Sequence, residues 1–429
     1  MEIVRQLYLD RLIARKHNGL VKVITGIRRC GKSYLLLNLF KRHLLESGVA
    51  PENILIYEFD RWQSRHLRDP EAFFADLGQK INQTGRTYVL LDEVQMLADF
   101  SEVLNSLLRE PNLDLYVTGS NSKFLSSDVL TEFRGRGDEV HVFPLSFSET
   151  PSRHLKTKTF SEFMRAYDGD VYSGWTQYCT FGGMPMTLGM ATEEQKAAYL
   201  KRLFDETYLK DIVERNSVGK PQELEELIDV MASCTGTLTN PSKIADTFKS
   251  RLKSSITVNT VRTYIGYLQE AFLLTVAHRY DVKGRKYIGT PHKYYFEDVG
   301  LRNARLQFRQ VEETHLMENI IFNELRLRGY DVDVGCVNQR SVQDGRSLGR
   351  QLEVDFVANQ GSRRIYVQSA YRMADEEKLR QEKASLMAIR DAFKKIIIVG
   401  HPIKAAYDED GIYHMSIFDF LLKSDSLLW

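Results

Sequence analysis

The sequence predicts an α/β protein whose first part is a doubly wound parallel sheet, and three observations support this. Over the first 150 residues, short apolar runs of strand length alternate with longer stretches of helical periodicity. The first run, residues 21–24, leads through a glycine-containing loop into an amphipathic stretch that ends at Gly48. Two later runs end in acidic or small polar residues, as strands do at a ligand-binding edge. Because strand and helix alternate, the strands are expected to pair in parallel.

The loop after the first strand has the sequence GIRRCGKS, which fits the pattern G-x-x-x-x-G-K-[ST]. Bare glycine backbone in this pattern lets successive N–H groups point into one concavity around phosphate oxygens. We expect Lys32 to neutralise the β- and γ-phosphates and the Ser33 hydroxyl to ligate Mg²⁺. Cys30 is at a variable position of the pattern, and its side chain is expected to face outward. The predicted nucleotide-binding residues are Gly26, Ile27, Arg28, Arg29, Cys30, Gly31, Lys32, Ser33 and Tyr34.

A second strand is predicted at residues 53–60, and a third at Tyr88–Leu91, where it leads into Asp92 and Glu93. Four apolar residues that end in two acids are what a Walker B strand requires. Asp92 is then expected in the magnesium shell, and Glu93 is expected to orient or deprotonate the attacking water. The alternative is an acidic turn after a buried strand, but the position about sixty residues behind a phosphate loop favours the functional interpretation.

A fourth strand, at residues 113–122, ends in small hydroxyl and amide side chains. In a parallel sheet this strand is expected beside the phosphate-loop strand, where Thr118, Ser120 or Asn121 would contact the γ-phosphate or the attacking water as a sensor. A simple turn explains any one of them almost as well.

Two arginines, Arg134 and Arg136, precede the next predicted strand, EVHVFPLSF. Either is a candidate for the arginine that stabilises charge on the transferring phosphoryl group, from the same chain or from a neighbouring subunit. A solvated basic loop is the competing interpretation, because arginine–glycine pairs are common in loops.

The bulk composition sets broad limits. With 429 residues the chain is long enough for two to four domains, and 43% apolar content is ordinary for a globular protein. A net charge of +1 excludes a generally basic surface, so contact with nucleic acid would require a local patch. Four cysteines without C-x-x-C spacing argue against zinc and disulfides. No uninterrupted apolar segment suggests a signal peptide or a membrane span, so we expect a soluble cytoplasmic protein.

The motifs GIRRCGKS, LLDEVQ, TGSNSKFLS and FPLSFSE resemble, in order and spacing, a prokaryotic branch of the AAA ATPase superfamily. Later motifs, YCTFGGMP, ETYLKDIVERN, KYYFEDVGLRNA and LMENIIFNELRLRGYDVDVG, are similar to the rest of that family, whose C-terminal half is a domain of unknown function. The resemblance implies a P-loop AAA-type ATPase domain at residues 1–150. It also implies that a mostly helical lid, residues 151–235, closes over the nucleotide.

Residues 236–298 have the pattern of a winged helix-turn-helix, with two helices, a short link and a β-wing that turns at Lys283 and Gly284. Between residues 275 and 310, eight cations face three acids, which makes this stretch the candidate for contact with a DNA backbone. Packing against the ATPase is the alternative. The cations are Arg279, Lys283, Arg285, Lys286, Lys293, Arg302, Arg305 and Arg309.

Residues 299–429 alternate helix and strand in a way that resembles the PD-(D/E)xK nuclease fold. Helices are predicted at 312–328 and 376–393, and strands at 331–334, 352–358, 364–368 and 395–399. Glu318 and Asp355 match two metal-binding acids of that fold. The E-x-K positions correspond to Gln368 and Ala370, which lack both the carboxylate and the cation, so nuclease chemistry is predicted to be lost. Lys378 or Lys383 are candidate substitutes for the cation.

The sequence therefore predicts a protein that binds Mg-ATP, hydrolyses it and rearranges C-terminal domains that bind DNA or protein. Glu93, Lys32 and Arg136 are the predicted catalytic residues. Two alternatives remain: a nucleotide-dependent switch or DNA-binding regulator with negligible turnover, and an ATP-controlled nuclease. A homo-oligomer and a protein partner are compatible with this prediction, and a membrane is not.

Overall fold

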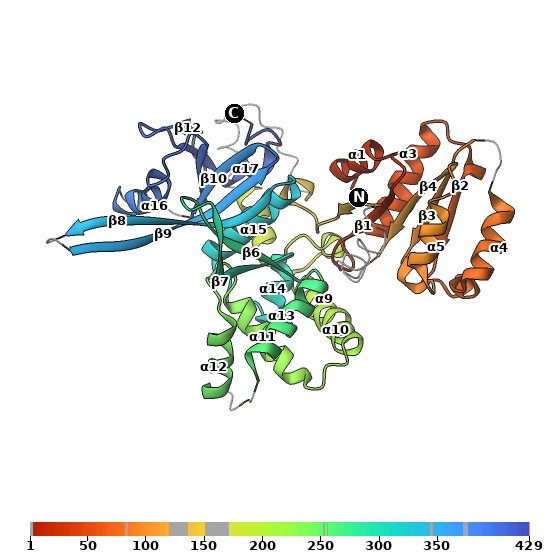
Figure 1. The fold of residues 1–429 in the computed structure, drawn as a ribbon, viewed down its shortest axis with the longest axis horizontal. Helices are drawn as coiled ribbons and strands as arrows, with labels where there is room; N and C mark the ends of the chain where they lie inside the picture. Colours follow the sequence, from red (N-terminus) through yellow and green to blue (C-terminus); the bar gives the residue numbers. More distant parts are fainter. Residues whose placement is uncertain are drawn as a thin grey trace. The chain divides into compact units, whose positions relative to one another are not determined.

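A computed structural model describes residues 3–81, 85–119, 136–150, 171–251, 254, 256–343, 346–371 and 376–428. Figure 1 shows the chain coloured along its sequence. The contacts between residues divide the chain into two compact units. Unit 1 comprises Met1–Pro144 with Glu270–Phe272, and unit 2 comprises Leu145–Gln269 with Leu273–Trp429. The division into four domains made above stays a prediction.

Unit 1 contains a five-stranded sheet in the order β2-β3-β4-β1-β5, in which every pair is parallel. The predicted parallel sheet is thus confirmed, and β4 lies beside the phosphate-loop strand β1 as expected. The strands are short, and β1, β3 and β4 are almost entirely buried. The strands of unit 1 are β1 (Val21–Thr25), β2 (Ile54–Glu58), β3 (Thr87–Asp92), β4 (Leu113–Thr118) and β5 (Gly137–His141).

Helices cover both faces of this sheet, which is why its strands are apolar on both sides. On one face, Val89 and Val117 pack in a core cluster with Phe73 of α4 and Leu104 of α5. On the other face, the Tyr116 ring lies 4.5 Å from that of Phe40, in the helical run after the phosphate loop. The helices are α1 (Gln6–Ala14), α2 (Lys32–Tyr34), a π-helical turn (Leu35–Phe40), α3 (Lys41–Glu46), α4 (Pro70–Lys80) and α5 (Phe100–Leu107).

Unit 2 is organised around an eight-stranded mixed sheet in the order β12-β13-β11-β10-β9-β8-β6-β7. The hairpin β6–β7 occupies the position predicted for the wing, and its strand β6 pairs in parallel with β8. The predicted border at 298/299 therefore separates a hairpin from the sheet with which it pairs. The strands are β6 (Leu274–Asp281), β7 (Lys286–Phe296), β8 (Asp331–Gln343), β9 (Arg346–Gln360), β10 (Arg363–Ala370), β11 (Lys394–Val399), β12 (Ala406–Tyr407) and β13 (Tyr413–Ser416).

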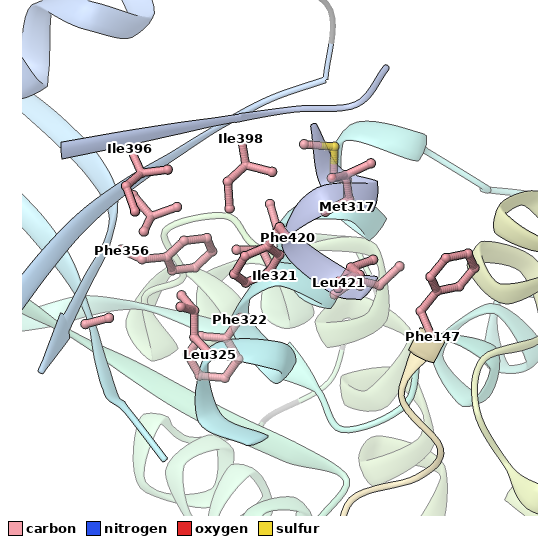
Figure 2. Close-up of a cluster of buried hydrophobic side chains, with 14 of the residues drawn as sticks. Phe147, Met317, Ile321, Phe322, Leu325, Phe356, Ile396, Ile398, Phe420 and Leu421 are labelled. Carbon is pink, nitrogen blue, oxygen red and sulfur yellow. The ribbon is translucent and has the colours of Figure 1, made fainter. Parts of the chain in front are cut away.

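The central strands of unit 2 separate two apolar cores. Figure 2 shows the larger core, in which Ile321 and Phe322 of α15 (Glu313–Leu327) face Phe356 of β9 and Ile396 of β11. The second core places Leu386 of α16 (Glu376–Met387) against the opposite face of the sheet. α17 (Ile417–Leu422) adds further apolar side chains to the larger core. Two helices on opposite faces explain why alternate residues of β9 and β10 are buried on both sides.

The remaining helices of unit 2 pack together, and two motifs that contain glycine make close contacts between them. The Gly183 N–H donates to the Asp298 carboxylate at 2.7 Å, and a side chain at Gly300 would lie 2.1 Å from the Phe181 carbonyl oxygen. The family-like motifs YCTFGGMP and KYYFEDVGLRNA therefore serve packing. The helices are α8 (Tyr172–Phe181), α9 (Glu193–Leu203), a π-helical turn (Phe204–Leu209), α10 (Lys210–Arg215), α11 (Pro221–Ser233), α12 (Pro241–Arg251), α13 (Val258–Glu270) and α14 (Val299–Arg305).

Two element boundaries differ from the prediction. The helix expected at 376–393 ends at Met387, because the Asp391 carboxylate accepts the Phe393 N–H at 3.2 Å and fixes a turn before β11. Strands β8 and β9 are much longer than 331–334 and 352–358, since their backbones pair from Asp331↔Asn359 to Gln343↔Arg346. Polar residues without apolar alternation hid this hairpin from sequence analysis. In the described part of the chain, no helix combines the length and apolar character that a membrane crossing needs.

Candidate nucleotide-binding site

The phosphate loop joins β1 to α2, and its two glycines are structurally required. Gly26 has φ 132°, and an added Cβ would lie only 2.1 Å from the Val142 carbonyl oxygen. Gly31 has φ 102° and stands at the start of α2, a conformation that side chains disfavour. The loop can therefore keep its backbone bare and close to its neighbours, as a phosphate cradle needs. The predicted strand, loop and helix geometry is present.

The Lys32 side chain lies folded back over the loop. Its ammonium donates to the carbonyl oxygens of Gly26 at 2.9 Å and Ile27 at 3.1 Å, and the residue is 4% exposed. This arrangement keeps a positive charge at the mouth of the loop, where phosphate oxygens are expected to replace the carbonyl acceptors.

A residue that sequence analysis missed fixes the loop from outside. The Arg5 guanidinium donates to the Cys30 carbonyl at 3.0 Å and to the Phe143 carbonyl at 2.7 Å, and Arg5 is itself buried. It thus ties the phosphate loop to the segment after β5. No local pattern signals this role, because Arg5 lies far from both partners in sequence.

The side chains of the loop are placed unequally. Arg28 and Arg29 are exposed at the loop, and Tyr34 is 43% exposed. Cys30 was expected to face outward, and this is wrong: its side chain is fully buried, with Sγ close to Gly26. Burial suits a thiol that packs as a small apolar group, so Cys30 contributes its backbone to the loop.

Asp92 ends β3 at the same edge of the sheet. Its carboxylate accepts a hydrogen bond of 2.5 Å from the Thr118 hydroxyl and another from Ser33 of the phosphate loop. Burial raises the pKa of Asp92, while these two hydrogen bonds act against the rise. A carboxylate held in a dry position next to a serine hydroxyl is a place that favours a cation.

Glu93 follows directly and has the left-handed backbone conformation, with φ 52°. Its N–H donates to the Thr118 hydroxyl at 3.0 Å, and its carboxylate accepts a hydrogen bond from Gln95. A strained residue held by its neighbours at a sheet edge is typical of functional sites. Thr118 therefore contacts both acids, and the sensor role predicted for it, toward the γ-phosphate or the attacking water, stays a prediction.

Arg136 lies at the other edge of the sheet. It precedes β5, its carbonyl accepts the N–H of Val21 at the beginning of β1, and its side chain is exposed. Since β1 and β5 are parallel, Arg136 lies at the N-terminal ends of these strands, whereas the phosphate loop lies at their C-terminal ends. The geometry excludes Arg136 as a finger for its own chain, whereas the role in a neighbouring subunit stays a prediction. Ser120, Asn121 and Arg134 lie outside the described residues.

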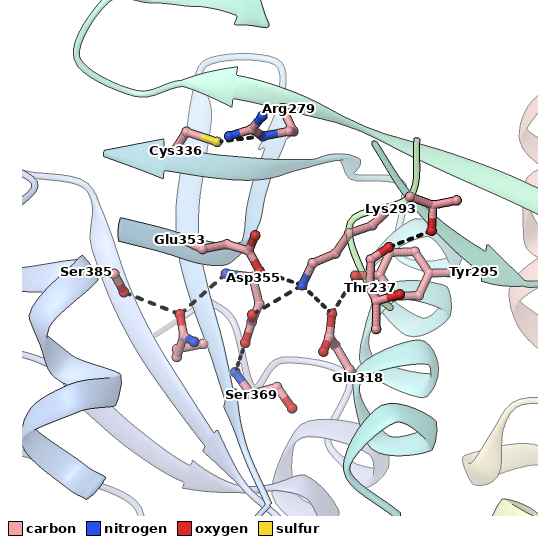
Figure 3. A network of polar contacts seen from close by, with 12 residues as sticks. Thr237, Arg279, Lys293, Tyr295, Glu318, Cys336, Glu353, Asp355, Ser369 and Ser385 are labelled. Atoms are coloured by element: carbon pink, nitrogen blue, oxygen red, sulfur yellow. Dashed lines mark hydrogen bonds and ion pairs between the residues drawn. The ribbon is translucent and has the colours of Figure 1, made fainter. Parts of the chain in front are cut away.

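A second polar cluster occupies unit 2 (Figure 3). The Lys293 ammonium of β7 lies 2.8 Å from the Glu318 carboxylate, 2.7 Å from that of Glu353 and 3.7 Å from that of Asp355. Tyr295 donates to the same oxygen of Glu318 at 2.6 Å. Lys293 is 4% exposed, and although burial alone would lower its pKa, the three carboxylates raise it above its ordinary value. A lysine thus occupies the centre of a group of acids that includes Glu318 and Asp355, the two acids matched to the metal-binding positions of the nuclease fold.

Of the other predicted members of the nuclease-like site, Gln368 adjoins this cluster through its amide oxygen, which accepts the Asp355 N–H at 3.3 Å. Gln368 turns toward α16, where its amide donates to Glu382 at 3.0 Å, and Ala370 packs in the second core. Both residues face away from Glu318. Lys383 pairs with Asp408 at 3.0 Å and with Asp410, and the side chain of Lys378 lies outside the description. Sequence analysis missed Glu353 and assigned Lys293 to a DNA-binding surface.

The pKa of Asp355 predicts a pH effect. Burial and the Glu318 carboxylate raise the pKa of Asp355 from 3.8 to about 8. The charge of Lys293 and the hydrogen bond from the Ser369 N–H act to lower it. The folded chain then holds a proton that the unfolded chain releases above pH 3.8. The free energy of unfolding should fall by up to about 1.4 kcal/mol per pH unit from there to pH 8, and then level.

Urea unfolding between pH 5 and 9 measures this slope. Asp355→Asn replaces the titrating carboxyl group by an amide, so the free energy of unfolding of this variant should fall less over that range. Asp331→Asn, which changes an exposed aspartate, should follow the wild type. Parallel curves for Asp355→Asn and wild type would contradict the assignment.

Four of the eight cations in the predicted basic patch are engaged in contacts within unit 2. Lys293 is enclosed as described, Arg302 is 1% exposed and donates to the Ala232 carbonyl at 2.8 Å, and Arg279 bonds Cys336. Arg305 ion-pairs with Asp229. These four cations are engaged within unit 2, so the count of charge in the sequence overstated what a DNA backbone would meet. Lys283, Arg285, Lys286 and Arg309 stay exposed.

Comparisons with known proteins agree with this geometry. A family model described as an AAA domain matches residues 18–150, and a domain of unknown function matches residues 172–312. The chain is 33% identical to an uncharacterized protein of Haemophilus influenzae over 98% of its own length and 99% of that protein. An uncharacterized protein of Methanocaldococcus jannaschii is 25% identical, with 93% and 85% covered.

Unit 1 is therefore a P-loop domain of the AAA superfamily, and the chain belongs to the same family as the Haemophilus influenzae protein. Among solved structures, the Aeropyrum pernix ORC1 protein in complex with DNA matches at 14% identity and a TM-score of 0.29. That match covers 71% of this chain and 92% of the other.

Proposed function

We propose that this protein binds Mg-ATP and hydrolyses it to ADP and phosphate. The observation that carries the proposal is the convergence of Lys32, Ser33, Asp92 and Glu93 at one edge of a parallel sheet. A Gly-rich backbone, a cation, a hydroxyl with a buried carboxylate and a second acid are the parts that phosphoryl transfer needs.

The donor set at Ser33 and Asp92 fits magnesium. A hydroxyl and a carboxylate that already share a hydrogen bond supply two oxygen ligands, and Mg²⁺ in such sites takes its other ligands from phosphates and water. When bound, the ion neutralises charge that develops on the phosphate oxygens.

The protein's own residues divide the remaining work. The loop N–H groups and Lys32 hold the phosphates, and Glu93 orients and deprotonates the attacking water. Thr118 keeps both acids in place through its single hydroxyl. This division gives each residue of the site a separate and testable part.

Lys32→Ala tests the binding step. The variant lacks the charge that faces the β- and γ-phosphates, so ATP binding should weaken by about 1.5–3 kcal/mol. Titration with a fluorescent ATP analogue measures the affinity, and magnesium-dependent phosphate release measures turnover. Lys41→Ala on α3 is the matched control and should keep both values. An unchanged affinity in Lys32→Ala would show that nucleotide does not bind at this loop.

We further propose that the ATP cycle rearranges unit 2, whose winged-helix-like and nuclease-like parts serve as a binding surface. The elements α12, α13 and the β6–β7 hairpin support the first comparison, and the order α15-β8-β9-β10-α16-β11 supports the second. Lys293 among the acids favours a domain that cleaves nothing, since a fixed ammonium fills the place of a metal ion. An ATP switch with negligible turnover is the alternative that Glu93 argues against.

A further inference from the structure

A pocket with a volume of about 850 Å³ opens on unit 2 beside the second apolar core. Val282 and Ile389, both members of that core, form part of its lining. Its other walls come from segments that lie far apart in the sequence: the turn between β6 and β7, the turn between β9 and β10, and the segment between α16 and β11. The fold itself, and no local motif, builds this hollow.

The pocket is strongly basic. Five cations line it against the single carboxylate of Asp391, which leaves four positive charges in excess on a chain whose net charge is only +1. Asp391 is already engaged, because it accepts the Tyr366 hydroxyl at 2.6 Å and the Phe393 N–H. Its single negative charge offsets only one of the five positive charges. The cations are Lys283, Arg285, Arg363, Arg364 and Arg390.

Three of the five cations have no hydrogen-bond or ion-pair partner among the described residues. Arg364 donates to Asn359 at 2.7 Å, and Lys283 donates to the Asn338 carbonyl at 3.0 Å. In the parts of the chain that the structure describes, no hydrogen bond or ion pair involves the side chain of Arg285, Arg363 or Arg390. Unpaired guanidinium groups around one hollow favour an anion with several oxygens, and phosphate matches their forked geometry.

Aromatic rings stand among these cations. The Arg364 guanidinium lies 5.3 Å from the Tyr280 ring centroid and 5.5 Å from that of Phe393. Phe393 is 42% exposed, although a large apolar side chain normally seeks burial. Cations next to an exposed aromatic face are the combination with which proteins hold unpaired nucleotides, the phosphate on the cations and the base on the ring.

We propose that this pocket binds a nucleotide unit of single-stranded nucleic acid, with its phosphates on Arg285, Arg363 and Arg390 and a base stacked against Phe393. A single strand is favoured over a duplex because a paired base has no free face to offer the ring. The pocket is built without the phosphate loop, since all of its lining residues belong to unit 2.

Fluorescence anisotropy of a short labelled oligo(dT) strand, measured on the full chain without ATP or magnesium, tests the proposal. Arg363→Gln/Arg390→Gln should weaken binding about tenfold at one fixed salt concentration. The slope of log K against log salt should also drop by about 1.4, the value for two lost phosphate contacts. Phe393→Ala should weaken binding about tenfold without changing the slope.

Matched controls separate the pocket from general charge. Arg202→Gln/Lys404→Gln removes two exposed cations of unit 2 outside the pocket and should bind as the wild type does. Competition with thymidine monophosphate tests whether the pocket binds a free nucleotide or requires a strand. Displacement of the labelled oligo(dT) at millimolar concentrations indicates that a free nucleotide suffices, and no displacement indicates that a strand is required. Wild-type affinity in both Arg363→Gln/Arg390→Gln and Phe393→Ala, with unchanged thermal unfolding, would overturn the proposal.

Discussion

Glu93→Gln should bind ATP as the wild type does and hydrolyse it at least about a hundredfold more slowly. The amide keeps the size of the carboxylate and its place beside Gln95, but it cannot accept a proton from the attacking water. Because Lys32 and the loop N–H groups are untouched, the phosphates lose no contact. The loss should therefore appear in kcat and leave the affinity for ATP unchanged.

Single-turnover phosphate release and titration with a fluorescent ATP analogue measure the two quantities separately. Glu102→Gln is the matched control, since it makes the same exchange at an exposed position in the first turn of α5. Turnover at the wild-type rate in Glu93→Gln would show that another group acts as the base. Weak turnover in the wild type itself would favour the nucleotide switch.

Lys293→Met should lower the free energy of unfolding by about 3–5 kcal/mol near neutral pH. Methionine fills a similar volume, so little packing is lost, but the carboxylates of Glu318 and Glu353 are left without their cation, while Asp355 holds a proton at this pH. Glu318 and Asp355 are largely enclosed, with side-chain exposures of 10% and 11%, so water cannot replace the ammonium. Repulsion among the acids then opposes folding.

Urea unfolding of unit 2, followed by tryptophan fluorescence, measures this loss. Lys423→Met removes an exposed lysine that pairs with the nearby Asp419, and it should change stability by less than about 1 kcal/mol. The double variant Lys293→Met/Glu318→Gln should recover part of the loss, because one of the uncompensated charges is gone. A Lys293→Met protein as stable as the wild type would contradict the role of the ammonium.

The parts of the nucleotide site that follow one another in the chain could be predicted from sequence. Lys32 and Ser33 follow a strand and a glycine loop, and Asp92 and Glu93 follow another strand, so local pattern and a parallel sheet suffice to bring them together. Arg5 could not be found in this way, because only the folded chain brings it to the Cys30 carbonyl. Arg136 was left open as a finger for its own chain or for a neighbour, and only the parallel pairing of β5 with β1 shows that it lies at the end of the strands away from the loop.

In unit 2 the order of elements was predictable and the chemistry was not. Glu318 and Asp355 were identified, but Lys293 was counted as a surface cation because sequence alone does not report burial. Gln368 and Ala370 were matched to the E-x-K positions, but sequence alone does not show which face of β10 they occupy, since a strand with both faces buried shows no alternation that would reveal it.

The pairing of β6 with β8 limits where recombination can divide the gene. The hairpin and the sheet that follows are one hydrogen-bonded object, and the hairpin also supplies the cation for acids on β9 and α15. A gene joined or cut at residue 298 would carry the acids without their lysine and would expose the edge of β8. Recombination can therefore not exchange the wing and the nuclease-like part as separate modules, because the hairpin and the sheet have to be inherited together.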